Sequence, residues 1–128
     1  MHYATFVWLK EQAYKFFFPA GRRLAVRWDD EAAFPPLDPR QAALLAGRFI
    51  DTHLPDSGRS LQSISLKKAW GPDVLDQYWY YIVEFAIPDL KDFNDSELVQ
   101  VPVLMDGSLP KFLPVAGVHD QVPRPQDA

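Results

Sequence analysis

The chain has 128 residues, a formal net charge of −4 and no cysteine. A length of this order corresponds to one domain and allows a hydrophobic core without cross-links. Without cysteine, disulfide frameworks, thiolate zinc sites and cysteine nucleophiles are excluded. The acidic balance argues against a general nucleic-acid binder, because such proteins need a basic surface.

The first predicted element covers residues 3–18, where apolar residues recur at helical spacing. They are Tyr3, Phe6, Val7, Leu9, Ala13, Tyr14 and Phe17. The pattern predicts an N-terminal helix, and a pair of short aromatic strands is the alternative interpretation. Lys10, Glu11 and Lys15 interrupt the apolar run, so neither a signal peptide nor a membrane span is predicted. We therefore expect a soluble, cytoplasmic protein.

An additional strand and a helix are predicted next. Leu24 to Asp29 alternates between apolar and polar residues, which is typical of a half-buried strand. The helix is predicted from Asp38 to about Leu54. Asp38 suits the N-cap, Pro39 the first helical position and Gln41 the third position of a capping box.

Three strand signals follow this helix, at residues 63–68, 78–87 and 99–105. The middle one belongs to the sequence QYWYYIVEFAI, whose alternating aromatic and β-branched side chains predict a central strand. Pro102 lacks a backbone donor, so the third strand is predicted to lie at an edge. Asp106-Gly107 favours a hairpin into a last short strand near residues 108–113.

The predicted fold class is α+β. We expect the capped helix to pack on a three- to four-stranded antiparallel meander, with an N-terminal helix and an additional strand. Residues 1–115 are predicted to form the single domain, and residues 116–128 a flexible, proline-rich C-terminal tail. In outline this arrangement resembles cystatin-like and many small bacterial domains, a likeness of shape that implies no function.

A candidate binding surface lies where the central strand begins. Trp70, Tyr78 and Tyr80 are close in sequence, and aromatic side chains of this kind are favoured at protein interfaces. Asp73 and Asp76 lie beside them, so the aromatic patch would have an acidic rim suited to a basic partner. The alternative is that the rings pack under the N-terminal helix.

A candidate pocket involves His53 and Glu84. His53 lies on the apolar side of the capped helix, near its C-terminus, and Glu84 is the one charged residue of the central strand. Either side chain could line a pocket between sheet and helix. No catalytic residue, metal ligand or cofactor is predicted, because the sequence contains no phosphate-binding loop, nucleophile elbow or metal-ligand motif.

The favoured hypothesis is a non-enzymatic protein-binding module, such as an inhibitor or immunity-type protein that acts by occluding a basic partner. A homodimer formed through an exposed sheet edge is a variant of this hypothesis. Neither a nucleic acid nor a membrane is expected as a partner. The alternative hypothesis is a small-molecule-binding domain or enzyme with a pocket between sheet and helix.

Overall fold

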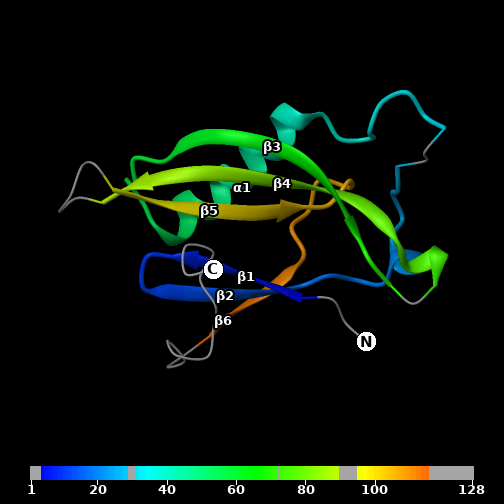
Figure 1. Cartoon of the computed structure of the whole chain (residues 1–128), viewed down its shortest axis with the longest axis horizontal. Coiled ribbons are helices and arrows are strands. Elements are labelled where there is room, and N and C mark those ends of the chain that lie inside the picture. Colours follow the sequence, from blue (N-terminus) through cyan, green and yellow to red (C-terminus); the bar gives the residue numbers. More distant parts are fainter. Residues whose placement is uncertain (1–3, 29–30, 72, 90–94, 116–128) are drawn as a thin grey trace.

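The computed structural model describes residues 4–28, 31–71, 73–89 and 95–115. Within these ranges the chain forms two three-stranded antiparallel sheets and one α-helix (Figure 1). One sheet has the order β3 (Ser60–Ala69), β4 (Tyr78–Pro88) and β5 (Ser96–Val103). The other has the order β1 (Ala4–Leu9), β2 (Gln12–Phe17) and β6 (Lys111–Val115). The predicted α+β class is confirmed.

The predicted capped helix is confirmed as α1 (Pro39–His53). The Asp38 carboxylate accepts a hydrogen bond of 2.7 Å from the backbone N–H of Arg40, which satisfies one of the unpaired donors of the first turn. Figure 1 shows α1 behind the sheet of β3, β4 and β5. None of the described helices is long and apolar enough to cross a bilayer.

The main core lies between α1 and the two sheets. Alternate side chains of β4 (Tyr81, Val83, Phe85 and Ile87) point toward the helix, because successive strand residues face opposite sides. On α1, Phe49 and Ile50 are buried against them. The Tyr81 hydroxyl donates 2.6 Å to the carbonyl of Leu37, so the buried phenol keeps a polar partner just before the helix begins.

The predicted N-terminal helix is wrong, and the alternative interpretation as two strands is confirmed. β1 and β2 form an antiparallel hairpin, in which Leu9 pairs with Gln12 across a two-residue turn. Lys10 adopts a positive φ of 56° in that turn. Its backbone N–H donates to Glu97 Oε2 at 3.1 Å and its ammonium group to the Pro88 carbonyl at 3.0 Å. The alternating β-branched and aromatic residues of β1 are compatible with this strand pairing.

The predicted additional strand is also wrong. Residues 24–28 form no regular strand in the described chain, although a short 3₁₀ helix, η1 (Gly21–Arg23), precedes them. The Arg27 guanidinium donates to the carbonyls of Leu75 and Gln77, so a side chain attaches this segment to the loop between β3 and β4.

The sheet that packs against α1 has three strands, β3, β4 and β5. β5 is followed by the predicted turn at Asp106-Gly107, where Gly107 has a φ of 88° and its N–H donates to Leu104. The last strand, however, is β6, and it pairs with β2 in the other sheet. The turn therefore redirects the chain between sheets and closes no hairpin. Residues 116–128, predicted as a tail, lie outside the described residues.

A second apolar cluster covers part of the sheet face opposite α1. Its buried members are Phe18, Ala69, Tyr78, Tyr80, Ile82 and Leu104. The cover that the sequence assigned to an N-terminal helix is supplied by Phe18, the residue after β2, with Leu24 packed alongside. Figure 1 also shows β1 running beside β5, so the two sheets lie edge to edge.

Candidate functional site

The loop between β3 and β4, residues 70–77, exposes three large apolar side chains. Trp70 is 69% exposed, Val74 77% and Leu75 59%. Val74 and Leu75 lie in a second 3₁₀ helix, η2 (Val74–Asp76). We refer to Trp70, Val74 and Leu75 as the apolar tip. Isolated exposed apolar residues are common, but several in one short loop are typical of an interaction site.

Ion pairs hold the loop that carries the apolar tip. Arg22 of η1 binds Asp76 with both ends of its guanidinium: Nε lies 2.9 Å from Oδ1 and Nη2 lies 3.0 Å from Oδ2. The same Nη2 lies 3.4 Å from Asp73 Oδ2. Hydrogen bonding to Arg22 lowers the pKa of the Asp76 carboxyl. Asp73 also caps η2, since its Oδ1 accepts from the N–H of Leu75 at 3.2 Å.

Backbone contacts support the same loop. Arg27 donates to the Leu75 carbonyl at 3.0 Å and to the Gln77 carbonyl. A Cβ at Gly21 would lie 2.8 Å from the Leu75 oxygen, and one at Gly71 would lie 2.6 Å from the Asp76 Cβ. These glycines permit a close approach that larger residues would prevent. The described residues of the loop are thus attached to η1 and to Arg27 by several contacts.

The structure separates the five residues predicted for the binding surface into two groups. Trp70, Asp73 and Asp76 lie together in the loop, whereas Tyr78 and Tyr80 are buried. The Tyr78 hydroxyl donates to the Pro19 carbonyl at 2.9 Å, and the ring centroid of Tyr80 lies 4.7 Å from that of Phe18. The tyrosines therefore belong to the second apolar cluster, and Trp70 is the exposed aromatic residue among the five.

Sequence reasoning missed Val74 and Leu75. The available signal was an apolar pair between Asp73 and Asp76 in a segment that a Gly-Pro pair separates from β3. Apolar residues in so short a loop cannot all reach the core, so exposure could have been inferred. Asp76, in contrast, is largely used by Arg22, and its side chain is only 14% exposed.

The two residues predicted for the alternative pocket are not brought together. His53 lies on the α1 side, where Nδ1 is 2.8 Å from the Phe49 carbonyl and the ring packs against Tyr14 and Phe112. Glu84 points to the opposite face of β4 and accepts a hydrogen bond of 2.9 Å from the Gln100 amide. The sheet separates the two side chains, so they do not share a cavity.

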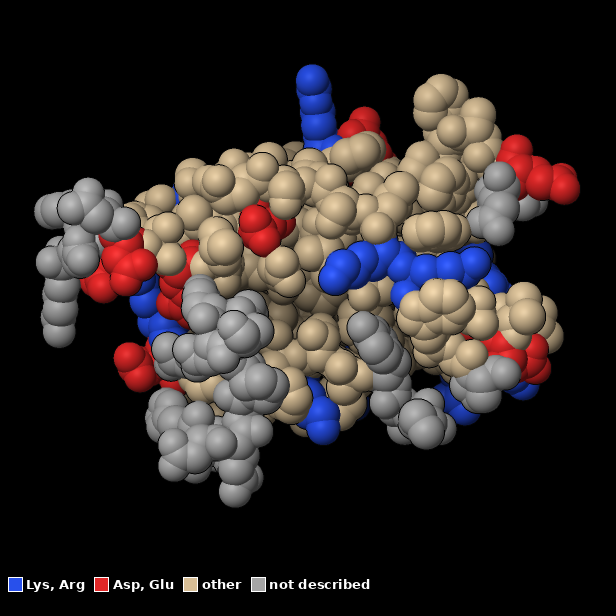
Figure 2. Space-filling view, viewed as in Figure 1, with Lys and Arg blue, Asp and Glu red and all other residues tan. Residues whose placement is uncertain are grey.

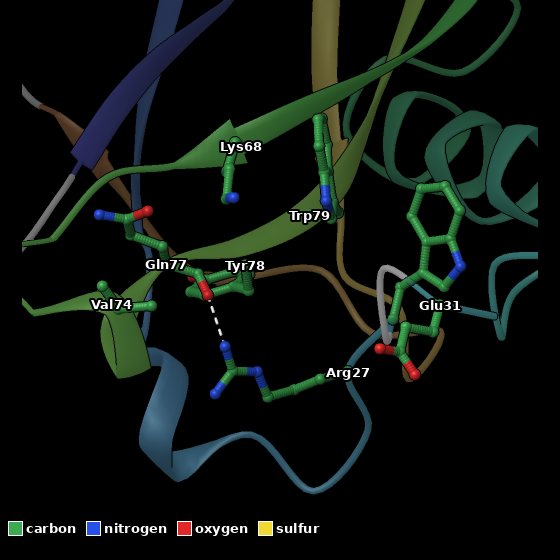
Figure 3. Close-up of a pocket in the computed structure, with 8 residues that line it drawn as sticks. Arg27, Glu31, Lys68, Val74, Gln77, Tyr78 and Trp79 are labelled. Atoms are coloured by element: carbon green, nitrogen blue, oxygen red, sulfur yellow. Dashed lines mark hydrogen bonds between the residues drawn. The ribbon is translucent and has the colours of Figure 1, made fainter.

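An open hollow of about 510 Å³ lies next to the apolar tip, at the end of the sheet where β3 ends and β4 begins (Figure 3). The rings of Trp28 and Trp79 are 6.0 Å apart, and the Lys68 ammonium lies 5.5 Å from the Trp79 ring centroid. The lining residues are Arg27, Trp28, Glu31, Lys68, Val74, Gln77, Tyr78 and Trp79. Val74 belongs to both features, so the hollow and the tip form one continuous surface.

Charged side chains of both signs are interspersed on the sheet face opposite α1. Figure 2 shows mostly uncharged side chains over β3, β4 and β5, with an acidic group and basic side chains lying among them. The sequence matches no protein-family model, and neither a similar curated protein nor a similar solved structure was found.

Proposed function

We propose that this protein is a non-enzymatic protein-binding module and that the apolar tip is its main contact surface. The observation that carries the proposal is the combination of exposure and attachment in one loop. Trp70, Val74 and Leu75 are more than half exposed, while Arg22 binds the Asp76 carboxylate of the same loop and Arg27 binds the Leu75 backbone carbonyl.

The physical reason is the entropy of binding. Ordering flexible side chains and loops reduces affinity, so a contact surface that is already fixed loses less free energy on association. Burying each large apolar side chain of the tip would stabilise a complex by roughly 1.5–3 kcal/mol. Three such side chains supply an interface centre of the kind that dominates binding energy, with Trp70 as the aromatic anchor.

The partner proposed is a basic protein with an apolar depression that receives the tip. The net charge of −4 would steer a basic partner toward this chain at long range. At short range, Asp73 is the more exposed of the two acidic groups in the loop, because Asp76 is largely covered by Arg22. An inhibitor or immunity-type protein that occludes such a partner fits these features.

The test is capture of a partner from the source organism, with variants that distinguish surfaces. Tagged wild type is compared with the double variant Trp70→Ala/Leu75→Ser and with Leu44→Ser, which changes a 63% exposed leucine on α1. We expect one stoichiometric partner with wild type and Leu44→Ser, and binding at least about 30-fold weaker with the double variant. Equal binding by all three proteins would exclude the tip as the contact surface.

The hollow supports a second candidate, a small-molecule-binding domain. Its volume of about 510 Å³ lies within the usual range of ligand sites. Two tryptophans with Lys68 and Arg27 suit an aromatic anion. Titration with aromatic carboxylates, followed by tryptophan fluorescence, tests this candidate. Saturable quenching that Lys68→Gln weakens would support it; no quenching up to millimolar ligand would exclude it.

A further inference from the structure

The outer edge of β3 is a second surface, separate from the apolar tip. Among the described strands, β3 pairs only with β4, so its other edge has no strand beside it. The strand is ten residues long, contains no proline, and most of its side chains from Ser60 to Lys67 are exposed. An edge of this length can accept another strand, because its outward N–H and C=O groups are available.

The other edges are less suitable. β6 has five residues and includes Pro114, which lacks a backbone donor. β1 and β5 lie beside each other, where the Lys10 N–H donates to Glu97. In β3 itself, an irregular register between Leu61 and Ser63 leaves Ser63–Ala69 as the regular part of the strand. A docking strand would therefore pair along this regular part.

We propose that a second copy of this chain pairs with β3 antiparallel about a two-fold axis at Ser65. The β3-β4-β5 sheets of the two copies would then join into one six-stranded sheet, with the α1 helices of both copies on the same face. In this register Ser65 lies opposite Ser65 of the second copy, Leu66 opposite Ile64, and Lys67 opposite Ser63. The proposal is independent of the partner bound by the apolar tip.

Charge complementarity favours this occupant and this register. Within the same copy, Ser63 of β3 lies opposite Glu84 of β4, on the face away from α1. Lys67 of one copy would thus project over the partner Ser63 toward the partner Glu84, twice per dimer. A parallel in-register pairing would instead place lysines next to lysines at Lys67 and Lys68, which is unfavourable. The lysines therefore select the antiparallel arrangement.

Apolar contacts act on the other face. Leu66 and Ile64 point toward the α1 side, since they pair with Tyr81 and Val83 of β4. Leu66 is 37% exposed and Ile64 is partly buried. In the proposed register these two residues meet across the new strand pair, so both would lose solvent contact on dimerisation. Cross-strand pairs of this type stabilise sheets.

Disulfide trapping tests the register, because the natural chain has no cysteine. In Ser65→Cys the two introduced thiols would have Cα atoms about 4.5–5.5 Å apart, within the range that a disulfide bridges. The matched control is Ser63→Cys, whose two Cα atoms would lie roughly 13 Å apart, four residues along the strand. Both serines are exposed, so both variants should fold, which circular dichroism checks.

We expect mild oxidation to convert Ser65→Cys to a covalent dimer and to give little covalent dimer with Ser63→Cys. Sedimentation equilibrium should show that the wild type is a dimer. Lys67→Glu and Glu84→Lys should each raise the dimer dissociation constant by about 2- to 30-fold, since two exposed ion pairs between the copies are lost. The double variant Lys67→Glu/Glu84→Lys should restore the dissociation constant of the wild type. A folded wild type that stays monomeric at millimolar concentration, or equal trapping of both cysteine variants, would overturn the proposal. Trp70→Ala should leave dimerisation unchanged, so this test is separate from that of the apolar tip.

Discussion

Two groups of large apolar side chains in this protein lie in opposite environments. Around α1, the ring centroids of Phe16, Phe49 and Phe112 lie within 4.9–5.3 Å of one another. Phe16 and Phe49 are buried, and Phe112 is partly buried against them. In the β3–β4 loop, Trp70 and Leu75 are exposed, and the loop is held by charged and backbone contacts. The first group stabilises the fold, whereas the second contributes little to it and is available for binding.

The largest change in stability is expected in the group of Phe16, Phe49 and Phe112 around α1. Phe49→Ala should lower the free energy of unfolding by about 3–5 kcal/mol, because it removes a buried ring and leaves a cavity. Urea denaturation measures the change, and Leu44→Ala on the exposed side of α1 is the control, with an expected change within about 0.5 kcal/mol. A loss below about 1 kcal/mol for Phe49→Ala would contradict the packing described.

An intermediate effect is expected where the loop meets η1. Gly21→Ala would place a Cβ 2.8 Å from the Leu75 carbonyl oxygen, so the loop must move. We expect a destabilisation of about 1–3 kcal/mol, as for overpacked sites, with faster hydrogen exchange at residues 74–77. Unchanged exchange there would mean that η1 does not hold the loop.

A small effect is expected at the tip itself. Trp70→Ala should change the free energy of unfolding by no more than about 0.5 kcal/mol, because the side chain is largely exposed. Thermal and urea denaturation check this value. A destabilisation as large as that of Phe49→Ala would show that Trp70 belongs to the core and would remove the contrast between the two groups.

The smallest expected effect is the pH dependence of the ion pair between Arg22 and Asp76. Arg22 lowers the pKa of the Asp76 carboxyl below its ordinary value of 3.8, so their ion pair is fully present above about pH 4 and is lost as pH falls through the lowered pKa. An NMR titration should therefore give Asp76 a midpoint below 3.8 in the wild type. In Arg22→Gln the midpoint should rise toward that value. The same midpoint in both proteins would contradict the ion pair.

The sequence predicted those elements whose local signals agree with the tertiary packing. Asp38 and Pro39 marked the start of α1, and the alternation through Tyr81, Val83 and Phe85 marked β4. The prediction failed at residues 3–18, where helical and strand patterns overlap. There the choice depends on pairing with β6, which is about a hundred residues away in the sequence. Strand partners at such separation leave no local signal.

The candidate site was predicted only in part, again because the environment of its residues depends on segments that are distant in the sequence. Trp70 and Asp73 could be found from composition, but the burial of Tyr78 and Tyr80 depends on Phe18 and Pro19, which come from a distant segment. Likewise, the role of Asp76 depends on Arg22. Sequence proximity identified the loop, and only the three-dimensional contacts separated its exposed residues from its supporting ones.

The most direct test of the apolar tip is site-specific photo-cross-linking in cells of the source organism. A photoreactive phenylalanine analogue is introduced at Val74, and in a matched protein at Leu44, an exposed position on α1. We predict a single discrete cross-linked protein with the probe at position 74 and none with the probe at position 44. No adduct at 74, or the same adducts at both positions, would contradict the assignment of the tip as a binding surface.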